Sequence, residues 1–286
     1  MDQRIRTLYS DYKKGGSDRR SFIRKLAVYT GGAAAAMAMM PHLEEEFEKV
    51  NSDQQVDPDL NTEFINYPGE TGQIKAYLAW PKTKGKYPAV LVIHENRGLQ
   101  PHIMDVTRRM AREGFLTMSP DALSPLGGTP EGDLNKVVDM IKQLDPDKTV
   151  KNFVDAVKYL ETNPLSTGKV GCTGFCWGGG MTNQVAVNEP TLKAAVPYYG
   201  KQPASEDVPK IKAALMAHYA ENDSFINPGI PAFEEALKKS GIEYHIYTYP
   251  GTQHAFNNDT SPERYNEQAA KLAWKRTVDF FREKLT

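Results

Sequence analysis

Cys176 stands among glycines in the stretch G-K-V-G-C-T-G-F-C-W-G-G-G, which begins at Gly168. A short apolar run leads up to the cysteine and a segment of helical composition follows it, so the pattern predicts a strand, a sharp turn and a helix. This is the nucleophile elbow G-x-S-x-G with cysteine in the place of serine. Side chains at Gly174 or Gly178 would collide with the neighbouring strand or helix. The pattern indicates a nucleophilic thiolate, against the alternative of a buried structural cysteine in a glycine-rich loop.

An acid and a histidine follow the cysteine in the order that a hydrolase triad can take. Asp223 and His254 each lie in the loop after a separate predicted strand. Taken singly, Asp223 could be a helix N-cap ahead of Pro228, and His254 could be a surface histidine in a turn. Their order and their positions after separate strands favour a triad, in which Asp223 orients His254 and His254 acts as the base for Cys176.

Residues 94–98 (H-E-N-R-G) follow the third predicted strand, where a second oxyanion donor is expected. The backbone N–H groups of Asn96 and Trp177 would together face the oxyanion that develops on an attacked carbonyl. Glu95 is unusual beside a nucleophile, because a charged carboxylate raises the pKa of a nearby thiol or holds it protonated through a hydrogen bond. The alternative is that Glu95 faces solvent or pairs with Arg97.

These candidates depend on a regular alternation of strands and helices that begins at residue 60. The predicted strands are residues 62–67, 73–80, 89–94, 115–119, 169–175, 194–199, 213–218 and 244–249. The predicted helices are residues 103–113, 148–161, 181–188, 230–240 and 262–284. Strands that alternate with helices imply right-handed crossovers and a mostly parallel sheet covered on both faces. Functional groups are then expected at the carboxyl ends of the strands.

The first 58 residues form an N-terminal extension of different composition. Residues 17–26 (S-D-R-R-S-F-I-R-K-L) resemble a twin-arginine export signal, with the small-residue run 31–40 as its h-region. That run is too short to span a bilayer, and no clear A-x-A cleavage site precedes Pro41. The alternative is an amphipathic helix packed on the domain or on a partner subunit, which would support a homo-oligomer. Residues 44–58 are expected to be a linker, and the protein is expected in the periplasm if the signal functions, otherwise in the cytoplasm.

Length and composition allow one large α/β domain over residues 59–286. The chain has 286 residues, 40% of them hydrophobic, and its 35 basic and 36 acidic residues show no signature of nucleic-acid binding. Cys172 and Cys176 are the two cysteines, and no CxxC pair or histidine cluster accompanies them. We therefore expect no disulfide, no zinc site and no other metal or organic cofactor.

Together these residues resemble the dienelactone hydrolase (carboxymethylenebutenolidase) family of the α/β-hydrolases over residues 60–286. The motifs that carry the resemblance are H-E-N-R-G-L at 94–99, S-P-D at 119–121, the cysteine elbow, Y-Y-G at 198–200, and the paired Asp223 and His254. The resemblance implies an α/β-hydrolase fold with Cys176 as nucleophile, His254 as base and Asp223 as its orienter. It also implies that Glu95 restrains the resting thiol.

One departure from the family concerns the substrate. The characterised enzymes bind a substrate carboxylate with arginines, at places that hold Ser124 and Asn258 here, while Arg97 is nearby but not equivalent. These three residues are the candidates for substrate binding. The resemblance implies hydrolysis of lactones, enol esters or other activated esters through a cysteine thioester. The alternatives are a general carboxylesterase on the same fold and a non-catalytic protein that docks on a partner through its N-terminal extension.

Overall fold

The computed structural model describes residues 4, 5, 8, 9, 12, 18–52, 57–130, 132 and 134–286. The chain divides into two compact units, Met1–Asp57 and Pro58–Thr286. Within the part of the chain that the structure describes, no helix is long and apolar enough to cross a membrane.

Two helices, α2 (Arg19–Thr30) and α3 (Ala33–Ser52), make up most of the described N-terminal unit. Asp18 caps α2 by accepting hydrogen bonds from the backbone N–H groups at 20 and 21, and Gly31 ends it in the left-handed conformation at φ 80°. The side chains buried within this unit form a small apolar cluster of Ile5, Tyr9, Phe22, Leu26, Ala36 and Leu43.

The predicted linker at residues 44–58 is wrong in its first part, because α3 continues to Ser52. Residues 44–49 (E-E-E-F-E-K) are mostly good helix formers, so their acidic composition is compatible with an exposed helix as well as with a linker. Residues 53–56 lie outside the described part of the chain. The Arg19-Arg20 pair lies at the start of α2, and export through it stays a prediction.

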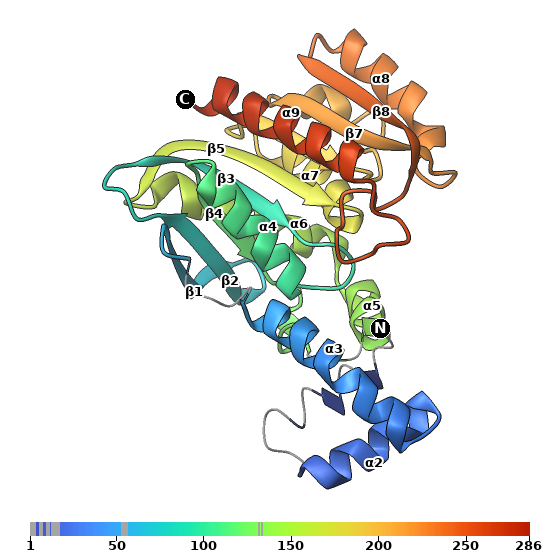
Figure 1. Ribbon diagram of the computed structural model, residues 1–286. Coiled ribbons are helices and arrows are strands. Elements are labelled where there is room, and N and C mark those ends of the chain that lie inside the picture. The colour runs from blue at the N-terminus through green and yellow to red at the C-terminus, as the bar shows by residue number, and fades with distance from the viewer. Residues whose placement is uncertain are drawn as a thin grey trace. The chain divides into compact units, whose positions relative to one another are not determined.

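An eight-stranded sheet organises the described part of the second unit (Figure 1). Its strands are β1 (Leu60–Gly69), β2 (Gly72–Pro81), β3 (Tyr87–Ile93), β4 (Leu116–Pro120), β5 (Ser166–Phe175), β6 (Ala194–Tyr198), β7 (Ala214–Asn222) and β8 (Tyr244–Gln253). They lie in the order β1-β2-β4-β3-β5-β6-β7-β8. The pairings β1–β2 and β2–β4 are antiparallel and the other five are parallel, so the predicted mostly parallel sheet is confirmed.

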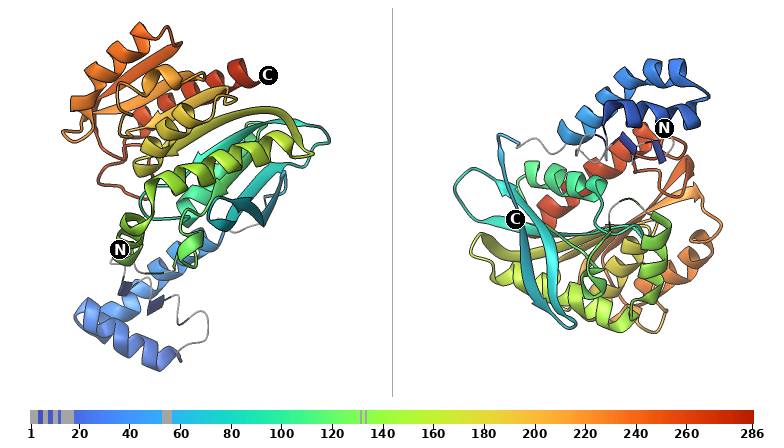
Figure 2. Two further views of the ribbon diagram at one scale, coloured as in Figure 1. Left: turned by 180° about the vertical axis from the view of Figure 1, so that it is seen from behind. Right: turned by 90° about the horizontal axis from the view of Figure 1, so that it is seen from below.

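Helices cover both faces of this sheet. They are α4 (Pro101–Arg112), α5 (Leu134–Gln143), α6 (Pro146–Thr162), α7 (Trp177–Asn188), α8 (Ile230–Lys239) and α9 (Glu267–Leu285). Alternate residues of a strand point to opposite faces, so Val90 and Val92 of β3 belong to the apolar cluster shared with α4 and α9, while Leu91 and Ile93 belong to the cluster shared with α6, α7 and α8. Figure 2 shows α6 and α7 on the side of the sheet away from α4.

Two helix boundaries and one whole helix differ from the sequence prediction. Helix α7 begins at Trp177 rather than at residue 181, because glycines that disfavour helices in isolation are tolerated where packing requires them. Helix α9 begins at Glu267 rather than at residue 262, with Asn266 as its N-cap. Helix α5 was not predicted, and its apolar side chains pack against Leu123 and the Trp177 ring. It therefore supports the residue that follows the proposed nucleophile.

Candidate active site

Cys176 occupies the turn between β5 and α7 with φ 57° and ψ −117°. A Cβ atom at Gly174 would lie 2.3 Å from the carbonyl oxygen of Gly178, and one at Gly178 would lie 2.3 Å from the carbonyl oxygen of His94. Both separations are far below van der Waals contact. The two glycines are therefore needed for the close approach of α7 to β5 and β3, as the elbow pattern predicted.

Backbone strain is concentrated around this turn. Among the described residues, the non-glycine positions with positive φ are Cys176 (57°), Tyr199 (38°) and Ala255 (71°). Tyr199 follows the neighbouring strand β6, and Ala255 follows His254. Such conformations cost free energy and persist where the surrounding structure enforces them, commonly at functional sites. The three positions thus mark the carboxyl edge of the sheet as the candidate site.

His254 and Asp223 form the predicted pair, with the Nδ1 atom of the histidine 2.5 Å from the Oδ2 atom of the aspartate. The other Asp223 oxygen accepts from the backbone N–H groups of Phe225 and Ile226, at 3.3 and 3.1 Å. One carboxylate oxygen therefore contacts His254, as the predicted triad requires, and the other serves the turn before Asn227. Asp223 is not a helix N-cap, because the N-cap of α8 is Gly229. With the proton on Nδ1, the Nε2 atom of His254 is left able to accept a proton.

The sulfur of Cys176 faces the two predicted oxyanion donors. The backbone N–H groups of Trp177 and Asn96 are directed at it and lower its pKa. Burial, followed by the negative charge of Glu95, acts more strongly in the other direction, and the pKa of the thiol is raised to about 11. Within the described part of the chain, no hydrogen bond joins this thiol to His254. Cys176 is therefore a thiol rather than a thiolate at neutral pH.

Glu95 is almost fully buried, and its Oε2 atom accepts a hydrogen bond of 2.9 Å from the side-chain amide of Asn258. The interpretation of Glu95 as a solvent-facing residue is wrong. Arg97 is half-buried, and among the described residues no ion pair joins it to Glu95. Asn258 thus binds the carboxylate whose charge raises the pKa of Cys176.

His94 is a part of the site that sequence reasoning missed. Its Nε2 atom accepts from the backbone N–H of Ala122 at 3.1 Å, so the proton of the neutral ring lies on Nδ1, which donates to the Glu95 carbonyl at 2.6 Å. Burial lowers its pKa, which keeps the ring neutral. The ring also stacks on Trp177, with centroids 5.4 Å apart. His94 therefore ties the Glu95 loop to the loop after β4 and to the start of α7.

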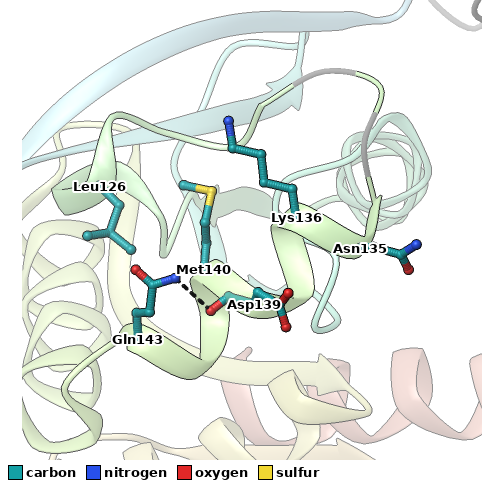
Figure 3. A pocket seen from close by; sticks show the side chains of 6 residues that line it. All are labelled: Leu126, Asn135, Lys136, Asp139, Met140 and Gln143. Carbon is teal, nitrogen blue, oxygen red and sulfur yellow. Dashed lines mark hydrogen bonds between the residues drawn. The ribbon is translucent and has the colours of Figure 1, made fainter.

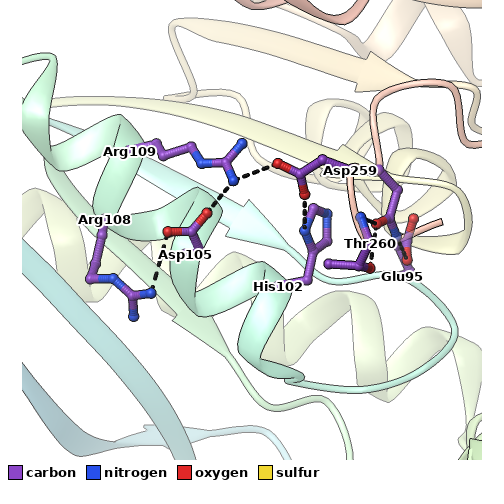
Figure 4. Close-up of polar contacts among 8 residues, drawn as sticks. Glu95, His102, Asp105, Arg108, Arg109, Asp259 and Thr260 are labelled. Atoms are coloured by element: carbon purple, nitrogen blue, oxygen red, sulfur yellow. Dashed lines mark hydrogen bonds and ion pairs between the residues drawn. The ribbon is translucent and has the colours of Figure 1, made fainter. Parts of the chain in front are cut away.

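Asp259 holds the loop after His254 against α4 (Figure 4). One of its oxygens lies 3.2 Å from Nδ1 of His102, and the other lies 2.6 Å from Nη2 of Arg109, which also pairs with Asp105. The contact with His102, followed by that with Arg109, lowers the pKa of Asp259 to about 2. Because Asp259 directly follows Asn258, this clamp also fixes the amide that binds Glu95.

Ser124 is not brought to this cluster by any contact within the described residues. Its hydroxyl donates to the Asp121 carbonyl at 2.7 Å and accepts from the Lys75 backbone N–H at 3.0 Å, so it serves the turn after β4. A hollow of about 660 Å³ beside this turn is lined by Leu126 and by α5 residues (Figure 3), and no proposed catalytic residue lines it. No group of three or more His, Cys, Asp or Glu side chains among the described residues could hold a metal ion.

Replacing Glu95 with glutamine should make Cys176 easier to alkylate at pH 8. Glutamine can still accept from Asn258 but removes the negative charge that raises the pKa of the thiol, so the midpoint of the alkylation rate should move to lower pH. At a pH below the midpoints of both proteins, the variant should be alkylated roughly tenfold faster for each pH unit by which its midpoint is lowered. The measurement is the iodoacetamide rate between pH 7 and 11. An unchanged curve would mean that burial alone raises this pKa.

Cys172 provides an internal control for this measurement. It is fully buried in β5, and burial raises the pKa of its thiol to about 12. We expect it to react far more slowly than Cys176 in both proteins, since iodoacetamide needs an exposed thiolate. A faster reaction of Cys172 in the Glu95→Gln variant would show that the substitution loosens the domain.

Known proteins are similar to this chain in sequence. The sequence profile of the dienelactone hydrolase family matches residues 74–285. A protein of Methylorubrum extorquens described as "Putative carboxymethylenebutenolidase" is 32% identical over 233 residues, which are 77% of this chain and 80% of that protein. A protein of Escherichia coli K12 with the same description is 31% identical over 239 residues, which are 77% of this chain and 86% of the relative.

Solved structures give the same result for the fold. The "Putative Dienelactone Hydrolase" of Klebsiella pneumoniae is 27% identical with a TM-score of 0.69, covering 78% of this chain and 98% of its own. An esterase of Pyrobaculum calidifontis is 19% identical with a TM-score of 0.57, covering 82% of this chain and 92% of its own. The predicted α/β-hydrolase fold is therefore confirmed.

Proposed function

Because the chain belongs to the dienelactone hydrolase family, we propose that this hydrolase cleaves lactones, enol esters and other activated esters through a thioester on Cys176. The main support is the elbow itself, where a cysteine at positive φ presents its sulfur to the amides of Asn96 and Trp177. The Asp223 carboxylate binds His254 and also contributes to the raised pKa of the thiol.

In the proposed reaction, the sulfur leaves the two amides and approaches His254, whose Nε2 atom takes the thiol proton. The thiolate attacks the ester carbonyl, and the amides of Asn96 and Trp177 then hold the oxyanion in the place that the sulfur occupied. The C–O bond breaks, and the protonated His254 gives its proton to the leaving oxygen. Water activated by His254 then hydrolyses the thioester and restores the thiol.

In this scheme Glu95 keeps the thiol protonated until substrate arrives. Burial of the sulfur, followed by the negative charge of Glu95, disfavours the thiolate and holds the pKa of Cys176 above the ordinary value for a thiol. Such a nucleophile attacks esters with good leaving groups more readily than ordinary alkyl esters. We therefore expect higher kcat/KM for lactones and enol esters than for a panel of alkyl esters, and equal values across both sets would indicate a general carboxylesterase.

Neutral substrates should compete well with anionic ones in this site. Glu95 is bonded to the amide of Asn258 rather than to a cation, so its charge would repel a substrate carboxylate. A bidentate arginine contact contributes roughly 2 to 3 kcal/mol, so its absence should weaken selection for anionic lactones by about one to two powers of ten. The measurement compares kcat/KM for a carboxylate-bearing lactone and its methyl ester at low and moderate salt.

A strong preference for the anion would contradict this expectation and would point to Arg97 or Arg264 as a relocated clamp. Arg264 lies in the loop after His254, where it pairs with Glu263 at 3.5 Å. Arg97→Met and Arg264→Met would then separate the two, because loss of the true clamp should raise KM only for the charged substrate.

A further inference from the structure

Tyr199 is held in its strained backbone conformation from both sides. Its φ is 38°, and its backbone N–H donates to the carbonyl of His218 in β7 at 2.7 Å. The following residue, Gly200, packs so closely on α7 that a Cβ atom there would lie 2.1 Å from the carbonyl carbon of Gly179. The conformation is thus imposed by strands and helix that also build the elbow, and it directs the Tyr199 side chain toward the site.

The Tyr199 side chain is 1% exposed and packs on the proposed catalytic base. Its ring centroid lies 5.0 Å from that of His254 and 5.4 Å from that of Phe256. Within the part of the chain that the structure describes, its buried hydroxyl makes no well-formed hydrogen bond: the backbone N–H of Asn257 is directed at its oxygen, and its proton has no acceptor. The neighbouring Tyr198 differs, because its hydroxyl is 2.6 Å from that of Thr277 in α9. Buried hydroxyls nearly always find an acceptor for their proton, so a hydroxyl without one beside the proposed catalytic histidine requires an explanation.

The charges near the Tyr199 hydroxyl define what it can do. Burial, followed by the negative charges of Glu95 and Cys176, raises its pKa well above the ordinary value for tyrosine. The hydroxyl therefore stays protonated throughout the reaction. It can act as a neutral hydrogen-bond donor but not as a base.

Building on the proposed ester hydrolysis, we propose that Tyr199 is a further catalytic residue, whose hydroxyl donates a hydrogen bond to the substrate oxygen that leaves when Cys176 is acylated. The carbonyl oxygen already has two donors, the amides of Asn96 and Trp177. The leaving oxygen receives its proton from His254, and the Tyr199 ring packs against that imidazole. Negative charge develops on this oxygen as the C–O bond breaks, and the tyrosine hydrogen bond stabilises it while the tyrosine keeps its proton.

The test uses Tyr199→Phe and acetate esters of three alcohols: p-nitrophenyl, phenyl and trifluoroethyl. For each ester kcat/KM reports acylation, so the acyl group is constant and only the leaving oxygen changes. We expect a loss of about tenfold for trifluoroethyl acetate and less than about threefold for p-nitrophenyl acetate, because the poorer leaving group needs the hydrogen bond more. Alkylation of Cys176 by iodoacetamide should keep its wild-type rate.

Stability provides a second measurement, with Tyr198→Phe as the matched control. Tyr199→Phe removes a buried hydroxyl that makes no well-formed hydrogen bond, so its thermal midpoint should stay close to that of the wild type. Tyr198→Phe removes the hydrogen bond to Thr277, so the thermal midpoint of this variant should fall. The dependence of its kcat/KM on the leaving group should remain that of the wild type. The two variants should therefore change stability and catalysis in opposite ways.

An equal loss for all three esters, or no loss, would overturn the assignment of Tyr199, and a lowered thermal midpoint with an equal loss would show that it serves packing. If the wild-type protein hydrolyses none of the esters, the proposed function itself fails and this inference fails with it. The wild-type rates therefore separate failure of the function from failure of the Tyr199 assignment.

Discussion

Replacing Cys176 with alanine should lower kcat/KM for ester and lactone hydrolysis by about three powers of ten or more. The strained elbow, the two amides directed at the sulfur and the histidine pair would all remain, but no atom would be left to form the thioester. Replacement by serine should keep at most weak activity, because an alcohol is a far poorer nucleophile unless its base already binds it. The measurement is kcat/KM for an activated ester and a lactone.

Cys172→Ala is the matched control for this experiment. Cys172 lies four residues earlier, is fully buried, and has its sulfur 3.7 Å from the Thr182 hydroxyl. Its loss should change stability more than kcat/KM. The intermediate can be sought directly, since acid quenching during turnover should leave an acyl mass on the Cys176 peptide that hydroxylamine removes. A Cys176→Ala protein within tenfold of wild-type activity would rule out the thioester route.

Asp223→Asn should lower kcat/KM by a comparable amount, about three to four powers of ten. The asparagine oxygen can still accept from the backbone N–H groups of Phe225 and Ile226, so the turn should fold normally. Its NH₂ group would instead face Nδ1 of His254 and favour the tautomer with the proton on Nε2. That tautomer cannot accept the thiol proton, and the loss should therefore fall on kcat with the fold intact.

Asp259→Asn is the matched control here, because Asp259 also contacts a histidine from a loop at the same edge of the sheet. It should weaken the clamp on α4, with a loss of less than about tenfold in kcat/KM and a lower thermal midpoint. Thermal melting and circular dichroism of both variants separate stability from catalysis. Equal losses in Asp223→Asn and Asp259→Asn would mean that the Asp223 interaction is structural rather than catalytic.

Much of the fold and the centre of the candidate site can be predicted from the sequence, because they depend on neighbouring residues. Runs such as 89–93 are apolar and mostly β-branched, which predicts a buried strand, and the glycines around Cys176 predict the sharp turn at the end of β5. In a parallel sheet, loops that follow different strands meet at one edge. The order of Cys176, Asp223 and His254 along the chain was therefore enough to predict the Asp223–His254 contact.

Errors arose where local composition was compatible with two structures. An acidic, polar stretch after residue 44 can be a linker or an exposed helix, and the structure has a helix as far as Ser52. Helix α5 was missed, although Val137 and Ile141 provide the spacing of a helical face. Its apolar side chains gain their stability from Leu123 and Trp177, which lie elsewhere in the chain.

Only the tertiary structure decided what surrounds the nucleophile. Glu95 and Asn258 are 163 residues apart, and Arg109 and Asp259 are 150 apart, so no local pattern indicates either contact. The sequence places Tyr199 only in the Y-Y-G motif. Its proposed role depends on a hydroxyl that makes no well-formed hydrogen bond and on the packing of its ring against His254, and both depend on the tertiary structure. Sequence patterns report the conformation of a few consecutive residues, whereas burial, charge and pairing depend on side chains that the sheet brings together from distant loops.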